Sequence, residues 1–173
     1  MKNKAVFLDR DGVINLTVFK MGKPRAPYTL EEFSFCPGVE EAVHLLKKKG
    51  FVLVVVTNQP DVARGWVSRD AVDLVNNHVS KKLKLPDIRS CFHTDSDRCA
   101  CRKPQPGMLL EAALDHHIDL SQSFMVGDRI SDIQAGRSAG CRTILISEMD
   151  TENALPDFIA PSLLHASSWI IAQ

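Results

Sequence analysis

This sequence of 173 residues has few aromatic residues and no excess of positive or negative charge. Aromatic side chains make up 6% of the chain, with one tyrosine and two tryptophans. Lysine plus arginine and aspartate plus glutamate number 21 each, so the formal net charge is zero. Proteins that bind nucleic acid rely on basic surfaces, and those that bind single strands also use aromatic platforms. We therefore expect no nucleic-acid partner.

Long hydrophobic runs are missing as well. The longest apolar stretches, such as residues 51–56, have six residues, whereas a membrane-spanning helix needs about 20. The apolar run near the N-terminus stops at Asp9, which makes it too short for the core of a secretory signal peptide. We therefore expect a cytoplasmic protein without a membrane partner.

The composition that remains is typical of a globular protein. Apolar residues make up 45% of the chain and charged residues 24%, which excludes a disordered or collagen-like chain. At roughly 150 residues per domain, we expect residues 1–173 to form a single domain. Nothing in the sequence requires a second subunit, so we expect a monomer.

Short β-branched runs alternate with helical patterns along the chain. This alternation predicts an α/β fold with a doubly wound, mainly parallel, Rossmann-like sheet. We expect strands at residues 5–8, 51–56, 88–92, 124–126, 142–146 and 158–160, and helices at residues 37–50, 68–85, 106–116, 130–139 and 162–172. Residues 17–28 contain glycine and prolines, and we expect them to form an irregular loop at the ligand-binding edge of the sheet.

Asp9 and Asp11 follow the first predicted strand, two positions apart. Two neighbouring carboxylates repel each other unless a divalent cation or a shared proton lies between them. Taken alone, the pair is equally consistent with a polar turn after a strand. Residues in other segments favour a cation site over a polar turn.

Three further segments bring polar groups to the same predicted edge. Thr57 follows the second strand, and Lys103 lies near a predicted helix N-terminus, which attracts anions. Asp128 follows another strand, and Asp132 lies four residues later. Each segment alone is also consistent with a satisfied turn, a solvated basic turn or a helix cap.

Together these segments resemble the four motifs of the phosphatases of the haloacid dehalogenase (HAD) superfamily, along nearly the whole chain. More narrowly, the chain is similar to the D,D-heptose 1,7-bisphosphate phosphatases and the histidinol-phosphate phosphatases, which are small and lack a large cap domain. Five segments carry this narrower resemblance: Asp9-Arg-Asp-Gly-Val-Ile-Asn15, Val56-Thr-Asn-Gln59, Ala63-Arg-Gly65, Cys101-Arg-Lys-Pro-Gln-Pro-Gly-Met108 and Met125-Val-Gly-Asp-Arg129.

The resemblance implies a magnesium-dependent phosphomonoesterase. Asp9 would be the nucleophile that forms an aspartyl-phosphate, and Asp11 the general acid and base. Thr57 and Lys103 would hold the transferring phosphoryl group. Magnesium would bind the carboxylates of Asp9 and Asp128 and the backbone carbonyl of Asp11. Asp132 would not contact the metal or the phosphoryl group directly, and would instead support Lys103 or a metal-bound water.

Three of the five cysteines lie close together with one histidine, in the pattern Cys-x-His-x5-Cys-x-Cys. Three thiolates and an imidazole fill a tetrahedral zinc shell and leave no open position, so a zinc ion here would be structural. The HAD relatives described above also carry such a zinc loop. A buried cysteine or a surface histidine is the better interpretation of any one of these residues alone. The expected ligands are Cys91, His93, Cys99 and Cys101.

The expected substrate is a small phosphorylated sugar. We expect its contacts to include Asn58, Gln59, Arg102 and Arg129, since the two arginines suit a second anionic group. Arg25 is a weaker candidate for binding that group. This favours a heptose 1,7-bisphosphate. Histidinol phosphate is the alternative, and a nucleic-acid 3′-phosphatase and a non-catalytic binding module are more remote ones.

The chain departs from the family pattern in two places. Residues 17–28 do not match the short sugar-facing stretch of the heptose phosphatases, and they carry three basic residues. The second motif continues with Pro60 and Asp61, where the family usually has a small residue and glycine. These departures concern the distal part of the substrate and leave the phosphatase chemistry unchanged.

Overall fold

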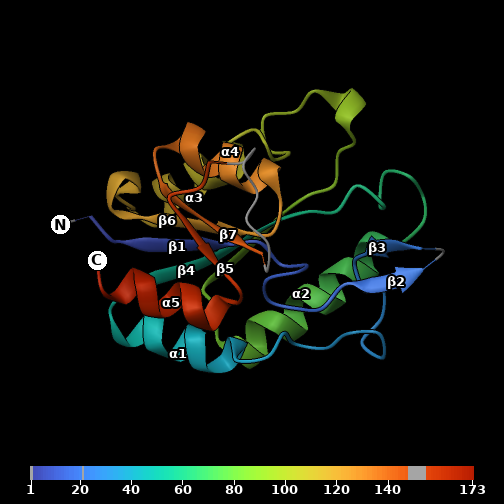
Figure 1. The fold of residues 1–173 in the computed structure, drawn as a ribbon. Coiled ribbons are helices and arrows are strands. Elements are labelled where there is room, and N and C mark those ends of the chain that lie inside the picture. The colour runs from blue at the N-terminus through green and yellow to red at the C-terminus, as the bar shows by residue number, and fades with distance from the viewer. Residues whose placement is uncertain (1, 21, 148–154) are drawn as a thin grey trace.

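The computed structural model describes residues 2–20, 22–147 and 155–173. Within these ranges the main sheet has six strands, all parallel, in the order β5-β4-β1-β6-β7-β8 (Figure 1). The chain starts near the centre, runs to one edge and then to the other, which confirms the predicted doubly wound fold. The strands are β1 (Ala5–Leu8), β4 (Val52–Asn58), β5 (Asp87–Cys91), β6 (Phe124–Gly127), β7 (Arg142–Ile146) and β8 (Phe158–Ala160).

Helices cover both faces of this sheet (Figure 1). Successive residues of a strand point to opposite faces: Val6 and Leu8 pack in the core on the α1 and α5 side, and Ala5 and Phe7 pack in the core on the α3 and α4 side. No large cap domain covers the sheet among the described residues, as predicted. The helices are α1 (Val39–Lys48), α2 (Arg69–Leu83), α3 (Gly107–Asp115), α4 (Ile130–Ala139) and α5 (Leu163–Ile171).

The register of the central strands brings the ends of β1, β4 and β6 together. Leu8 pairs with Val55 on one side and with Val126 on the other. The backbone N–H of Asp9 donates to the carbonyl of Val126 at 2.9 Å. The residues that follow these three strands therefore meet at one edge of the sheet.

The prediction of an irregular loop at residues 17–28 was wrong. The segment contains a two-stranded antiparallel hairpin made of β2 (Val18–Lys20) and β3 (Lys23–Arg25) (Figure 1); Met21 lies outside the described residues. Pro24 pairs with Phe19 in this ladder, and a strand with a free edge tolerates the missing N–H of proline.

None of the helices in the described ranges is both long enough and apolar enough to cross a membrane.

Candidate active site

A cavity of about 880 Å³ opens at the edge where β1, β4 and β6 end. Four residues predicted to be catalytic line it, namely Asp9, Asp11, Thr57 and Lys103. The β2–β3 hairpin and the loop after β4 form other parts of its wall. The structure thus brings Asp9 and Lys103, which lie 94 positions apart in the sequence, to the same cavity.

Lys103 lies at the base of this cavity and is almost fully buried. Its ammonium nitrogen is 2.7 Å from Oδ1 of Asp9, 2.6 Å from Oδ1 of Asp132 and 2.8 Å from the carbonyl oxygen of Val56. Burial by itself would lower the pKa of Lys103, but the carboxylates of Asp132 and Asp9 raise that pKa above its usual range. The site therefore contains a permanent positive charge next to Asp9.

The carboxylates of Asp9 and Asp128 are crowded at the same place. Burial raises the pKa of Asp9 to about 8, although Lys103 opposes the shift, and burial also raises the pKa of Asp128 to about 6. Oδ1 of Asp128 is buried and accepts no hydrogen bond from any described residue. Carboxylate oxygens of Asp9, Asp128 and Asp132 lie within 4.8 Å of one another. A buried oxygen without a hydrogen bond, lying among crowded carboxylates, fits a hard divalent cation such as Mg²⁺.

Gly12 allows the loop after β1 to approach Asp128 this closely. Its φ angle is +91°, and a Cβ atom at this position would lie 2.3 Å from Oδ2 of Asp128. Any larger residue would have to push that carboxylate away. The glycine is therefore part of the geometry of the candidate cation site.

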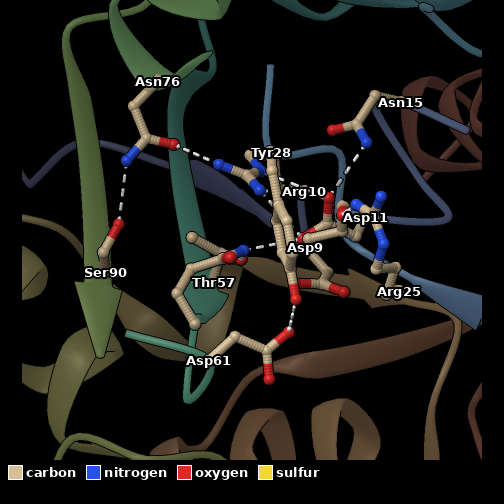
Figure 2. A network of polar contacts seen from close by, with 12 residues as sticks. Asp9, Arg10, Asp11, Asn15, Arg25, Tyr28, Thr57, Asp61, Asn76 and Ser90 are labelled. Carbon is tan, nitrogen blue, oxygen red and sulfur yellow. Dashed lines mark hydrogen bonds and ion pairs between the residues drawn. The ribbon is translucent and has the colours of Figure 1, made fainter. Parts of the chain in front are cut away.

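The side chain of Asp11 lies outside this carboxylate cluster. It accepts a hydrogen bond from Nδ2 of Asn15 at 2.9 Å (Figure 2). It also accepts one from Nε2 of Gln59 at 2.7 Å. Arg10 donates to both of its carboxylate oxygens at 3.2 Å. Three side chains therefore hold the Asp11 carboxylate at the wall of the cavity, and the backbone carbonyl is the part of Asp11 that was expected to reach a metal.

Two residues predicted to bind substrate line the cavity but also hold candidate catalytic residues. Gln59 donates to Oγ1 of Thr57 at 2.9 Å, in addition to its bond with Asp11. Asn58 accepts from the backbone N–H of Lys103 at 3.1 Å and donates to the Lys103 carbonyl at 3.0 Å. Each of these amides thus fixes the position of a neighbouring candidate catalytic residue.

The structure brings one of the two predicted arginines to the cavity. Arg129 lines the cavity, with Nε 4.0 Å from Oδ1 of Asp128. Arg102 is not among the described residues that line it. Instead, Arg102 donates to Asp95 at 2.7 Å and to the carbonyl of His93 at 3.3 Å. The carboxylate of Asp95, which the sequence analysis did not consider, draws this guanidinium toward the cysteine-containing loop.

The basic residues of the hairpin line the mouth of the cavity, and Arg25 among them was expected as a weaker candidate than Arg102 and Arg129 for binding an anionic group. Arg25 is held by Glu32 at 2.6 and 2.9 Å and stacks 4.0 Å from the centre of the Tyr28 ring. The three basic residues between positions 17 and 28 were the available sequence signal. The basic side chains around the mouth are Lys20, Lys23, Arg25, Arg64 and Arg129.

The four predicted zinc ligands lie together at the end of β5, which contributes Cys91, and in the loop that follows it. Sγ of Cys101 is 3.1 Å from Sγ of Cys91 and 3.4 Å from Sγ of Cys99, and Nδ1 of His93 is 3.3 Å from Sγ of Cys101. Ligand atoms around a tetrahedral zinc ion lie roughly 3.5 to 3.8 Å apart. All five cysteines are in the described part of the chain, and each is free. The cluster therefore fits a zinc ion with only small adjustments.

Comparison with known proteins supports the resemblance drawn from the motifs. A family model for HAD-hydrolase-like proteins matches residues 100–166. The D-glycero-beta-D-manno-heptose-1,7-bisphosphate 7-phosphatase of Helicobacter pylori is 36% identical over 150 residues, which cover 83% of each chain. The D-glycero-alpha-D-manno-heptose-1,7-bisphosphate 7-phosphatase of Campylobacter jejuni is 35% identical over 84% of this chain and 83% of its own.

Solved structures agree with these sequence matches. The D,D-heptose 1,7-bisphosphate phosphatase of B. bronchiseptica, which was solved with magnesium and phosphate, matches with a TM-score of 0.81 and 25% identity over 98% of both chains. A HAD-like phosphatase of Mesorhizobium loti also matches with a TM-score of 0.81, at 30% identity over 98% of this chain and 86% of its own. The chain therefore belongs to the D-glycero-manno-heptose-1,7-bisphosphate 7-phosphatase family of HAD-like phosphatases.

Proposed function

We propose that this phosphatase removes the 7-phosphate of a D-glycero-D-manno-heptose 1,7-bisphosphate. One observation carries the proposal: the cavity has Asp9 and Lys103 at its base and five basic side chains around its mouth. A sugar bisphosphate has one anionic group for each of these regions. The names of the relatives supply the identity of the sugar and of the phosphate removed.

The first chemical step forms a phosphoenzyme on Asp9. A carboxylate oxygen of Asp9 forms a bond to phosphorus while the bond from phosphorus to the sugar oxygen breaks. Lys103 and the hydroxyl of Thr57 stabilise the negative charge on the phosphoryl oxygens. Asp11 gives its proton to the departing sugar oxygen, so that the sugar leaves as a neutral alcohol.

The second step returns Asp9 to its starting form. Asp11 is now a carboxylate and removes a proton from a water molecule, whose oxygen attacks phosphorus. The bond from phosphorus to Asp9 breaks, and inorganic phosphate leaves. Asp11 holds a proton again at the end of the cycle.

Asp9 and Asp128 would hold Mg²⁺ through their carboxylates, and Asp11 through its backbone carbonyl. When bound, the cation supplies the positive charge that lets an anionic carboxylate approach a dianionic phosphate. Asp132 has a different role, because its carboxylate holds Lys103 at 2.6 Å and accepts from the backbone N–H of Arg129 at 3.0 Å.

We further propose that the cysteine and histidine cluster holds a structural Zn²⁺ ion. The distances between its donor atoms support four-coordinate binding without an open position. The loop that carries the cluster runs directly into Lys103. The ion would therefore fix the segment that delivers this lysine to the cavity.

We also propose that residues 1–173 act as a single domain, as a monomer in the cytoplasm. The continuous sheet supports one domain, and a zinc site made of three thiolates suits a reducing compartment. Light scattering of the purified protein measures the oligomeric state directly, and a dimer mass would contradict this part of the proposal.

The test is phosphate release with and without Mg²⁺ from a panel of substrates. The panel contains both anomers of the heptose 1,7-bisphosphate, fructose 1,6-bisphosphate, histidinol phosphate and a 3′-phosphorylated oligonucleotide. We expect Mg²⁺-dependent turnover of a heptose bisphosphate, and a fall of at least about 1,000-fold in Asp9→Asn. Asp70→Asn, at an exposed position in α2, is the matched control and retains wild-type turnover.

The same panel identifies the alternatives. Turnover of histidinol phosphate in preference to the heptose would keep the mechanism and overturn the substrate. The basic mouth of the cavity opposes that outcome, because histidinol phosphate carries a cationic amino group. No release from any substrate by protein loaded with metal would overturn the proposed function.

A further inference from the structure

Arg10 lies between Asp9 and Asp11 in the sequence and has no exposed surface. Its guanidinium donates to Asp11 at 3.2 and 3.3 Å and to Oδ1 of Asn76 at 2.7 Å (Figure 2). Taking a charge out of water costs several kcal/mol unless hydrogen bonds and an opposite charge compensate it. The burial of Arg10 therefore depends on these two partners.

Asn76 is in turn oriented by Ser90. Nδ2 of Asn76 donates to Oγ of Ser90 at 3.0 Å. A guanidinium has only donors, so Asn76 must turn its carbonyl oxygen toward Arg10 and its NH₂ group toward the serine. This fixes the amide orientation without ambiguity. Figure 2 shows the resulting line of contacts from Ser90 on β5, through Asn76 on α2, to Arg10 and Asp11.

The contacts of Arg10 restrict the direction of the Asp11 carboxylate. Arg10 donates to both carboxylate oxygens, while Asn15 donates to Oδ1 and Gln59 to Oδ2. Rotation of the carboxylate would break the paired bonds to the guanidinium. Rotation of the guanidinium would break the short bond to Asn76.

We propose that Arg10, oriented by Asn76 and Ser90, is a positioning residue that aims the Asp11 carboxylate for both proton transfers. The inference rests on the proposed role of Asp11 as general acid and base. It also makes the rate of phosphate release depend on two residues remote from the cavity, Asn76 and Ser90. Neither lines the active-site cavity among the described residues.

The test uses Asn76→Leu, a change of similar volume that removes the acceptor for Arg10. Asn77→Leu is the matched control, because Asn77 is the next residue of α2 and is exposed. Ser90→Ala is a milder second variant that removes only the outer contact. Each protein is assayed with the heptose bisphosphate and with p-nitrophenyl phosphate, and each assay is preceded by a thermal melt.

We expect Asn76→Leu to lower kcat for the heptose bisphosphate about 10- to 100-fold, while KM changes less than twofold. This loss is smaller than the roughly 100- to 10,000-fold attributed to a general acid–base group, because Asp11 is still present but less well aimed. With p-nitrophenyl phosphate the expected result is a stoichiometric burst of p-nitrophenolate followed by slow turnover. This phenolate leaves without a proton from Asp11, but water attack on the phosphoenzyme still needs Asp11 as base. Ser90→Ala is expected to show the same pattern with a smaller loss.

Three outcomes would overturn the inference. The first is that Asn76→Leu has the same kinetics as Asn77→Leu, and the second is an equal loss of activity with both substrates and no burst, which indicates only less folded protein. The third applies if Asn76→Leu does not fold, and is wild-type kinetics in Ser90→Ala. A wild-type protein that is folded but releases no phosphate would instead overturn the proposed function.

Discussion

The hydroxyl of Tyr28 donates a 2.7 Å hydrogen bond to Oδ2 of Asp61 and so joins the segment after the β2–β3 hairpin to the loop after β4 (Figure 2). These are the two segments in which the sequence departs from the pattern of its family. Burial, followed by the bond to Asp61, raises the pKa of Tyr28 to about 12. The hydroxyl therefore remains a donor throughout the pH range of an ordinary assay, and the two unusual segments form one wall of the cavity.

Removal of this link should weaken substrate binding rather than chemistry. We expect Tyr28→Phe to raise KM for the heptose bisphosphate about 3- to 10-fold, because the loss of one hydrogen bond costs about 1 kcal/mol. The ring and its stacking with Arg25 are kept in this variant. Steady-state kinetics provide the measurement, with kcat expected to stay within twofold of the wild type.

p-Nitrophenyl phosphate provides the control for this variant. We expect its single phosphate to bind at the Asp9 end of the cavity and its ring not to reach Tyr28, so its KM should not change in Tyr28→Phe. An equal rise in KM for both substrates would show that Tyr28 acts on the phosphoryl site and not on the distal wall.

The sheet and the base of the site were predictable from the sequence for a simple physical reason. In a parallel sheet the carboxyl ends of the strands share one edge, so polar residues that follow apolar runs must gather there. Asp9, Thr57 and Asp128 follow three such runs, and the structure places them at the same edge. Lys103 was predicted as a site residue from its motif. Its contact with Asp9 could not be predicted from the sequence, because it depends on how the loop before Lys103 folds.

Other features depend on side-chain directions that no local pattern encodes. Asn76 lies 66 positions from Arg10, and nothing in the helical spacing of α2 marks it as the partner of a buried cation. Arg102 was expected at the substrate, but Asp95 is close enough in the folded loop to bind it. The hairpin was missed because glycine and proline are more typical of loops than of short free-edged strands.

Gly12→Ala should damage the candidate magnesium site. Alanine at a φ of +91° costs about 1 to 2 kcal/mol, and its Cβ atom would displace the Asp128 carboxylate, which lies 2.3 Å away. We expect the Mg²⁺ concentration for half-maximal activity to rise at least about tenfold, measured by titration of phosphate release. Gly140→Ala is the matched control, with a φ of +88° and no atom within 4 Å of the added Cβ.

The two glycine variants distinguish the effect of backbone strain from the effect of displacing the Asp128 carboxylate. Both should lose unfolding free energy in urea because both have a positive φ, and Gly12→Ala should lose more because its Cβ also clashes with Asp128. Only Gly12→Ala should need more magnesium. If Gly140→Ala shows the same rise in magnesium requirement, backbone strain and not the contact with Asp128 would explain the effect.

Lys103→Met should make stability depend more strongly on magnesium than it does in the wild type. The substitution leaves the buried carboxylates of Asp9 and Asp132 without their shared cation. Breaking a buried ion pair from one side costs about 3 to 5 kcal/mol. We expect a loss of this order in unfolding free energy in the presence of a chelator, together with loss of turnover.

Millimolar Mg²⁺ should restore part of the stability of Lys103→Met but not its turnover, because a cation can offset the carboxylate repulsion but cannot hold the phosphoryl oxygens in place of the ammonium. The measurement is urea denaturation with and without Mg²⁺. Lys48→Met, at an exposed position in α1, should change stability by less than about 0.5 kcal/mol in either condition. No effect of Mg²⁺ on the Lys103 variant would place the cation away from these carboxylates.

Cys99→Ala should loosen both the loop and the phosphoryl site that the loop carries. Sγ of Cys99 lies 3.4 Å from Sγ of Cys101, and the loop continues into Lys103, whose backbone is held by Asn58. We expect loss of bound zinc by elemental analysis, a lower melting temperature and a higher KM for substrate, because the lysine is delivered less firmly. Cys141→Ala removes a buried cysteine outside the cluster and should lower the melting temperature while it keeps zinc and KM. Unchanged zinc content and kinetics in Cys99→Ala would contradict a zinc site that supports Lys103.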